Sequence, residues 1–174
     1  RKEEYLKIAI LGLGKLGSVL AALHSSSGNE VLGVDLSKSI VDSINEGKAP
    51  FLEPGLQELI DLSGSNLKGT TDAVEACQNA DASIVIVPTP SGSDGRFTNQ
   101  YVVKAVETIG RSIKSSSRRH TVIIASTVMP GSCSAEISKA LEESSGKLVG
   151  HGVGLVYNPQ FIALGSIVSN MRKP

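Results

Sequence analysis

The amino-acid sequence predicts an α/β fold, in which a doubly wound parallel sheet of about six strands carries helices on both faces. Short apolar runs of strand length alternate with amphipathic, helix-like stretches along the whole chain. The first apolar run leads into closely spaced glycines and then into a helix with an apolar face. No low-complexity tract or linker divides the 174 residues. We therefore expect one domain over residues 1–174, with right-handed crossovers between its strands.

The charge balance argues against nucleic-acid and membrane partners. The chain has 17 basic and 17 acidic residues, a formal net charge of +0 and 40% hydrophobic residues. The densest basic cluster, Arg118-Arg119-His120, is interpreted as a solvated loop. No apolar run reaches the roughly 18 residues that suggest a transmembrane helix.

The cysteines and histidines form no recognisable metal or disulfide pattern. Cys77 and Cys133 lack the spacing of metal ligands, and His24, His120 and His151 are scattered along the chain. We therefore predict no metal site. The cysteine usage fits a reducing compartment, so we expect a cytoplasmic protein.

A glycine-rich turn connects the first strand to the first helix. The stretch Lys7 to Leu23 reads KIAILGLGKLGSVLAAL, in which Gly12, Gly14 and Gly17 have the spacing G-x-G-x-x-G. The first glycine permits a tight turn, the second lets a pyrophosphate approach the backbone, and the third lets the helix pack closely on the strand. The unpaired N–H groups at the helix start would then bind the pyrophosphate. We assign to this Rossmann-type site Gly12, Leu13, Gly14, Lys15, Leu16 and Gly17.

An acidic residue ends the second predicted strand. Asp35 follows Gly17 by 18 positions, close to the roughly 20 expected for a carboxylate that binds the adenosine ribose hydroxyls. Because a carboxylate repels a 2′-phosphate, the predicted cofactor is NAD more than NADP. Lys38, three residues on, could partly offset that repulsion. The alternative for Asp35 is a solvated strand end or the N-cap of the next helix.

The remaining elements follow from the apolar pattern. Strands are expected over 8–11, 31–34, 67–70, 82–87, 121–125 and 153–156, and helices over about 19–23, 37–45, 54–62, 71–77, 100–115 and 134–142. Parallel strands place ligands beyond their carboxyl ends, so the loop from Pro88 to Asn99 is expected to line the cofactor site.

Five ordered motifs after the glycine turn carry a family resemblance. They are Asp35 with Lys38, GKAPFLEPGL of Gly47 to Leu56, VPTP of Val87 to Pro90, STVMPG of Ser126 to Gly131, and YNPQF of Tyr157 to Phe161. With the turn, they make the chain resemble, nearly end to end, the N-terminal NAD-binding domain of the UDP-glucose/GDP-mannose dehydrogenase family. That family oxidises the C6 hydroxyl of a sugar nucleotide to a carboxylate with two molecules of NAD.

The resemblance implies roles for several residues. Pro88 and Thr89 would contact the dinucleotide. An equally good interpretation of Thr89 is a turn residue between two prolines. Thr127 is similar to a family threonine beside the nicotinamide and the reacting C6, with a helix N-cap as the alternative. Glu53 matches the family's EPGL loop, where a structural turn fits as well as any chemical role.

The sequence departs from the family pattern after the last predicted strand. The family usually has a glutamate directly after the YNP-like segment and a second glutamate four residues later, and both assist proton and water steps. This chain has Gln160 and Leu164 at these positions. An amide forms hydrogen bonds but does not take a proton at neutral pH, and leucine does neither. Gln160 and Thr127 remain the candidate catalytic residues.

Family members continue into a dimerisation helix and a second domain, which supplies the nucleotide-sugar site, a lysine, an asparagine and a nucleophilic cysteine. We therefore expect this chain to bind NAD without turning over sugar nucleotide, as a monomer or weak dimer from a parent homodimer or larger assembly. Two alternatives stay open: the cofactor domain of another two-domain dehydrogenase, of the β-hydroxyacid kind, or a dinucleotide-sensing module without chemistry.

Overall fold

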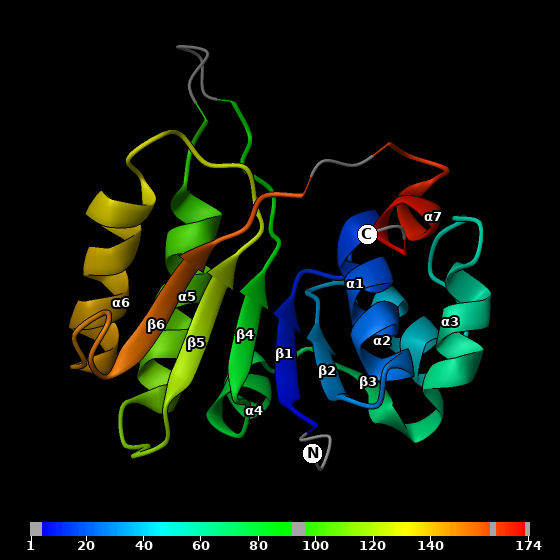
Figure 1. The fold of residues 1–174 in the computed structure, drawn as a ribbon, viewed down its shortest axis with the longest axis horizontal. Helices are drawn as coiled ribbons and strands as arrows, with labels where there is room; N and C mark the ends of the chain where they lie inside the picture. The colour runs from blue at the N-terminus through cyan, green and yellow to red at the C-terminus, as the bar shows by residue number, and fades with distance from the viewer. Residues whose placement is uncertain (1–4, 92–96, 161–162, 173–174) are drawn as a thin grey trace.

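A parallel sheet of six strands, in the order β3-β2-β1-β4-β5-β6, runs through the middle of the molecule (Figure 1). The structure is a computed structural model that describes residues 5–91, 97–160 and 163–172. Every pairing between neighbouring strands of this sheet is parallel. The strands are β1 (Lys7–Leu11), β2 (Glu30–Val34), β3 (Leu67–Thr70), β4 (Ala82–Val85), β5 (His120–Ile124) and β6 (Val153–Tyr157). The predicted class and number of strands are confirmed.

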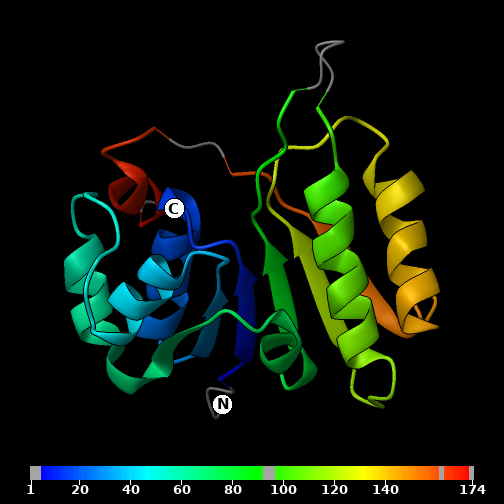
Figure 2. The same cartoon turned by 180° about the vertical axis from the view of Figure 1, so that it is seen from behind.

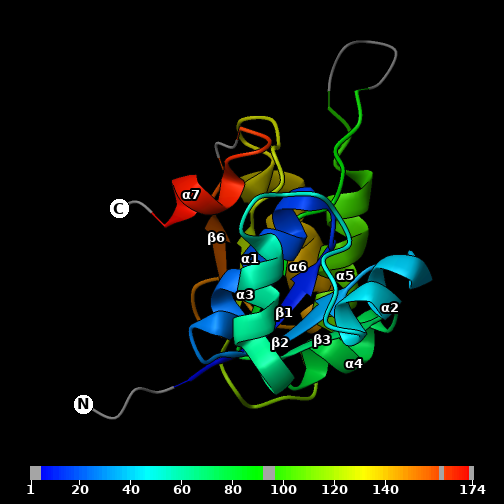
Figure 3. The same ribbon diagram turned by 90° about the vertical axis from the view of Figure 1, so that its right-hand side faces the viewer.

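Helices cover both faces of the sheet, as the views from behind and from the side show (Figures 2 and 3). One face carries α1 (Lys15–Ser26), α3 (Leu56–Ser63) and α7 (Ile167–Met171). The other carries α4 (Ala73–Gln78), α5 (Gln100–Ile113) and α6 (Ser138–Ser145). The short helix α2 (Lys38–Asn45) packs beside β3. None of the helices in the described part of the chain has the length and apolar character that crossing a membrane requires.

Strand β1 contributes to a separate apolar core on each face. Ile8 and Ile10 belong to the core under α1 and α3, whereas Ala9 and Leu11 belong to the core under α4 and α5. Successive side chains of a strand point to opposite faces, so a strand covered on both sides must be apolar at every position. This is why β1 appears in the sequence as an unbroken apolar run.

The boundaries of β4 and β5 differ from the predicted ranges. Strand β4 stops at Val85 rather than at residue 87. Ile86 N still bonds Leu11 O of β1 at 2.9 Å, but the N–H of Val87 is bound by the side chain of Ser126 instead of by a neighbouring strand. Strand β5 begins one residue early, at His120, which is buried. The interpretation of the basic cluster as a solvated loop is therefore wrong for its last residue.

The helix predicted over 134–142 is divided into two forms. A π-helical turn (Cys133–Ile137) precedes α6, and its wider winding is seen in the hydrogen bond from Ile137 N to Ser132 O, 3.1 Å long. Helix α6 continues three residues beyond the prediction, to Ser145. Gly146 then follows in the left-handed conformation with φ 68°, which is a common way for a helix to end.

Helix α7 was not predicted, and the explanation lies in a distant loop. Glu53 is only 6% exposed, and its carboxylate accepts hydrogen bonds from Gly165 N (2.9 Å) and Ile167 N (2.8 Å). Ile167 is the first residue of α7, where backbone N–H groups lack partners within the helix, and Gly165 lies just before the N-cap, Ser166. Ile167 and Val168 are buried under the helix against α1 and α3. Glu53 therefore has a structural role that joins two segments far apart in sequence.

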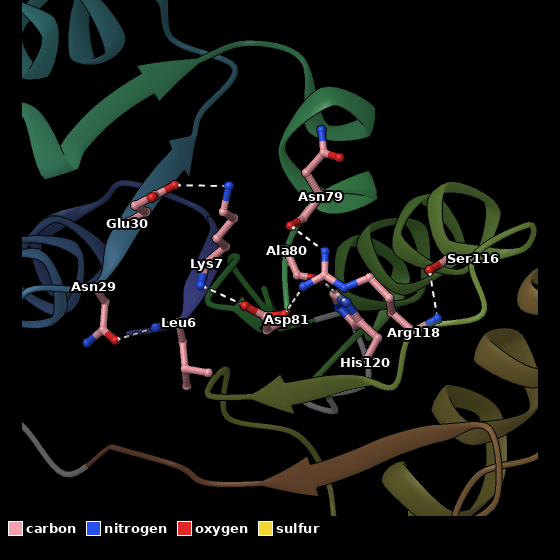
Figure 4. A network of polar contacts seen from close by, with 10 residues as sticks. All are labelled: Leu6, Lys7, Asn29, Glu30, Asn79, Ala80, Asp81, Ser116, Arg118 and His120. Carbon is pink, nitrogen blue, oxygen red and sulfur yellow. Dashed lines mark hydrogen bonds and ion pairs between the residues drawn. The ribbon is translucent and has the colours of Figure 1, made fainter. Parts of the chain in front are cut away.

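A polar network closes the amino-terminal edge of the sheet (Figure 4). Asp81, just before β4, accepts a hydrogen bond from Lys7 N at 2.8 Å and forms an ion pair with Arg118. The buried His120 bonds Ala80 O through Nδ1 (3.0 Å) and Ser83 Oγ through Nε2 (2.9 Å). These contacts connect β1, β4 and β5 at the edge opposite to the glycine turn.

Candidate cofactor-binding site

The candidate site lies at the carboxyl edge of the sheet, where the chain order reverses. Strand β1 has β2 on one side and β4 on the other, so the loops that leave β1 and β4 diverge. In open α/β sheets, ligands bind outside the carboxyl ends of the strands at this kind of position. The predicted cofactor-binding residues lie on the loops after β1, β2, β4 and β5 or in the first turn of the helix that follows, and Gln160 follows β6.

The three glycines of the turn meet different surroundings. Gly12 has φ 104°, and a β-carbon there would overlap the Ile86 carbonyl oxygen. A β-carbon at Gly17 would overlap the carbonyl oxygen of Gly12, so α1 could not approach the strand. Around the β-carbon position of Gly14, by contrast, no described residue other than Gly14 itself and its two chain neighbours has a heavy atom within 4 Å. The backbone is therefore bare and open at Gly14, where the sequence places the pyrophosphate.

The other residues of the turn differ in what they present to that space. Leu13 is fully buried, and its side chain fills the room left by Gly33, where a β-carbon would lie 2.6 Å from Leu13 Cδ2. Leu13 can therefore face a ligand only through its backbone. Leu16 is half-buried and packs against the apolar core under α1 and α3. Lys15, the first residue of α1, is exposed.

Asp35 joins the loop after β2 to the glycine turn. Its Oδ2 accepts a hydrogen bond from Leu13 N and its Oδ1 one from Ser37 N, both at 2.8 Å. Each carboxylate oxygen has lone pairs left to accept ribose hydroxyls. The N-cap of α2 is Ser37, so the alternative of a capping role for Asp35 is not what the structure shows. Lys38 forms an ion pair with Asp42 at 2.7 Å, one helical turn away.

Thr89 and Thr127 lie on the loops after β4 and β5. Thr89 is half-buried between Pro88 and Pro90, and Thr127 is exposed. Neither hydroxyl forms a hydrogen bond with any residue that the structure describes, so both could bind a ligand. The residue that precedes the next helical turn is Ser132, not Thr127. Part of the loop that was expected to line the site, residues 92–96, lies outside the described ranges.

Gln160 lies three residues beyond the end of β6. Asn158 N bonds Ile124 O at 2.9 Å, and Gln160 Nε2 then donates to Asn158 O at 3.2 Å. Gln160 lines a cavity of about 230 Å³ whose other walls include Ile84 and His24. Burial lowers the pKa of His24, which favours its neutral form. Leu164 is 64% exposed, and Phe161 of the YNPQF motif lies outside the described residues.

Ser126 is a residue of the site that the sequence analysis did not single out. Its Oγ accepts a hydrogen bond from Val87 N (2.9 Å) and donates one to Val87 O (2.8 Å). These bonds join the loop that carries Thr89 to the loop that carries Thr127. The signal available in the sequence was a serine directly at the carboxyl end of an apolar strand, inside the STVMPG motif.

The loops are connected in a continuous series along the carboxyl edge. Asp35 bonds Leu13 of the glycine turn, Gly12 lies against Ile86 at the end of β4, and Val87 is bonded to Ser126 after β5. The structure thus brings together residues from four separate strand ends. The open backbone at Gly14 and the acceptor oxygens of Asp35 fit a dinucleotide whose pyrophosphate lies on the turn.

Comparison with known proteins supports this reading. The sequence model of the UDP-glucose/GDP-mannose dehydrogenase family, NAD binding domain, matches residues 6–174. The GDP-mannose 6-dehydrogenase of Pseudomonas putida is 37% identical over 171 residues, which are 97% of this chain and 39% of that protein. A UDP-glucose 6-dehydrogenase of Haloferax volcanii is 35% identical over 170 residues, with the same coverage.

A solved structure agrees with the fold in detail. A ternary complex of GDP-mannose dehydrogenase from Pseudomonas aeruginosa matches with a TM-score of 0.93 and 38% identity, over 97% of this chain and 39% of that one. The chain thus spans about 39% of the length of these relatives. The chain belongs to the UDP-glucose/GDP-mannose dehydrogenase family, and its residues 6–174 match the NAD binding domain of that family.

Proposed function

We propose that this chain holds NAD for an enzyme that oxidises the C6 alcohol of a nucleotide sugar to a carboxylate. The observation that carries the proposal is the open backbone at Gly14, next to the turn residue Leu13 that Asp35 holds. The names of the relatives support the substrate class. Because the chain spans about 39% of those relatives, the reaction and its substrate belong to the whole protein.

The glycine turn and Asp35 would hold the adenosine half of NAD. The pyrophosphate would lie against Gly14 at the start of α1, whose first turn contains no acidic residue to repel it. Asp35 would accept hydrogen bonds from the ribose hydroxyls, and its charge would disfavour a 2′-phosphate. Lys38 offsets this little in the structure, since its charge is paired with Asp42.

The loops after β4 and β5 would hold the other half of the cofactor. Bound NAD supplies a hydride acceptor. Thr89 and Thr127 would orient it and the reacting carbon through their free hydroxyls, with Pro88 restricting the backbone before Thr89. Gln160 would contribute hydrogen bonds only, because an amide does not accept a proton at neutral pH.

Calorimetric titration with NAD and with NADP tests the cofactor assignment. We expect the wild-type chain to prefer NAD. Asp35→Ala should weaken NAD binding about tenfold to a hundredfold, since hydrogen bonds to a charged group are worth about 1.5–3 kcal/mol, and should abolish the preference. Glu58→Ala, which removes an exposed carboxylate of α3, is the matched control and should bind as wild type. Equal NAD affinity in Asp35→Ala would contradict the assignment.

A second candidate function is a module that binds NAD without chemistry. Gln160 and Leu164, in place of the glutamates that the family resemblance implies, favour it. The full-length protein distinguishes the two, because NADH production with UDP-glucose or GDP-mannose requires the dehydrogenase. NAD binding without NADH production from any nucleotide sugar would support the binding module instead.

We also propose a cytoplasmic location and an oligomeric parent. Cys77 and Cys133 are both free thiols, which is typical of proteins in reducing compartments. The family resemblance supports a homodimer or larger assembly for the whole protein, and a monomer or weak dimer for these 174 residues. Sedimentation of the whole protein and of these 174 residues, measured under the same conditions, would test the proposed oligomeric states.

A further inference from the structure

We propose that Ser126 is a positioning residue, which sets the relative place of Thr89 and Thr127 around the nicotinamide half of NAD. The inference rests on the proposed NAD site. Asp35 and Gly14 would hold adenosine and pyrophosphate beyond β2 and β1. Since a dinucleotide binds across the point where the strand order reverses, its other half must lie beyond β4 and β5.

The backbone ladder between β4 and β5 ends before it reaches the two threonines. Its last pair in register is Val85 with Ile124. Ala125 N and Ser126 N both bond Val85 O, at 2.9 and 3.1 Å. Beyond this point, no backbone hydrogen bond between described residues connects the two segments, although they leave the sheet side by side (Figures 1 and 2).

Where the backbone ladder ends, the hydroxyl of Ser126 connects the two segments by hydrogen bonds. It accepts from Val87 N at 2.9 Å and donates to Val87 O at 2.8 Å, so one side chain satisfies both backbone groups of one residue. A serine hydroxyl has one proton to donate and two lone pairs to accept with, which suits this double contact. No other side chain in the described residues has a hydrogen bond to Val87.

The location of these bonds makes them effective in positioning. Ser126 is 5% exposed and is followed directly by the exposed Thr127. Val87 is separated from Thr89 only by Pro88, whose ring fixes its φ angle, so the direction of the chain at Val87 determines where Thr89 lies. A buried hydrogen bond lost here leaves a backbone group without a partner, which the loop must move to correct.

The test compares NAD with ADP, which contains only the groups assigned to Asp35 and Gly14. Titrations use Ser126→Ala, Ser126→Cys and the control Ser63→Ala, which removes a buried serine of α3 that is 2% exposed and bonded to Ser25. Cysteine fills the space of the serine but is a weak donor and acceptor. We expect both Ser126 variants to bind NAD about tenfold more weakly and ADP within about twofold of wild type.

Each outcome decides a separate question. Equal losses for NAD and ADP would show that Ser126 is only structural, and wild-type NAD binding in Ser126→Cys would show that its hydrogen bonds are not needed. If the wild-type chain binds neither ligand, the proposed function of this chain fails. Hydrogen exchange then still tests the link: the Val87 amide should exchange about tenfold faster in Ser126→Ala and unchanged in Ser63→Ala. An unchanged Val87 rate would overturn it.

Discussion

Gly14 and Gly17 belong to one turn, but their surroundings give them different roles, one in ligand binding and one in packing. At Gly17, a β-carbon would overlap the Gly12 carbonyl oxygen, so the residue is fixed by packing within the protein. At Gly14, with φ −61° and ψ −172°, the backbone suits any L-residue and the space beside it is open. Only a ligand would require glycine there. Substitution at the residue scale therefore separates folding from binding.

Alanine at each position should produce opposite effects. Gly14→Ala is expected to unfold like wild type but to bind NAD at least about tenfold more weakly, because its methyl group enters the space for the pyrophosphate. Gly17→Ala should lower the free energy of unfolding by about 3 kcal/mol through overpacking. Urea unfolding and calorimetric titration measure the two effects. NAD binding by Gly14→Ala with unchanged affinity would remove the pyrophosphate from this turn.

The buried His120 is expected to make the stability of the folded protein depend on pH. Burial lowers its pKa in the folded protein below the ordinary 6.5, against weaker opposite effects of the Ala80 carbonyl and Asp81. The unfolded chain therefore binds the proton more readily. The full stabilisation is present above about pH 6.5 and declines as the pH falls through 6.5 toward the folded pKa.

Urea midpoints measured between pH 7.5 and about pH 5 test this expectation. The midpoint of the wild-type chain should fall in this range, whereas His120→Gln should have a lower midpoint at pH 7.5 and a flatter profile. His151→Gln, at an exposed position, is the control and should keep the wild-type slope. A wild-type slope in His120→Gln would assign the pH dependence to other groups.

At the scale of elements, the EPGL loop and α7 depend on one another. Helix α7 has five residues, too few to be stable alone. The Glu53 carboxylate binds the N–H of its first residue, Ile167, and the N–H of Gly165 just before its N-cap. Gly55, with φ 83°, brings the same loop against Val168. The loop therefore serves as the docking site of α7, and the proposed roles of Glu53 are reduced to this structural one.

Removing the Glu53 carboxylate should detach α7. Glu53→Ala is expected to lower the free energy of unfolding by about 2 kcal/mol, because the buried N–H of Ile167 and the partly buried N–H of Gly165 lose a charged acceptor. The Ile167 amide should then exchange faster with solvent while that of Ile10 in β1 keeps its protection. Glu58→Ala serves as control on the same segment. Unchanged protection of Ile167 in Glu53→Ala would mean that apolar packing alone holds the helix.

At the scale of the whole molecule, the site exists only when four strand ends meet. NAD should therefore stabilise the folded chain as a unit. At a concentration one hundred times its Kd, the gain is about 2.7 kcal/mol, which for this size corresponds to roughly 5–10 °C in Tm. Thermal scans with NAD and NADP should show the larger shift with NAD. Asp35→Ala should show a smaller shift with NAD at the same concentration, because a tenfold to hundredfold weaker affinity leaves a gain of only about 0.4–1.4 kcal/mol. An equal shift in that variant would place the cofactor elsewhere.

The sequence alone determined the sheet, the glycine turn and Asp35, because apolar periodicity, turn chemistry and spacing are local properties of the chain. The ordered short motifs likewise indicated the NAD-binding family. Tertiary structure decided what Glu53 and Ser126 contact, where Gln160 lies and that α7 forms. Those outcomes rest on hydrogen bonds between residues 34 to 114 positions apart, or on burial under distant helices. A pattern read within one segment carries no information on which distant partner the fold supplies.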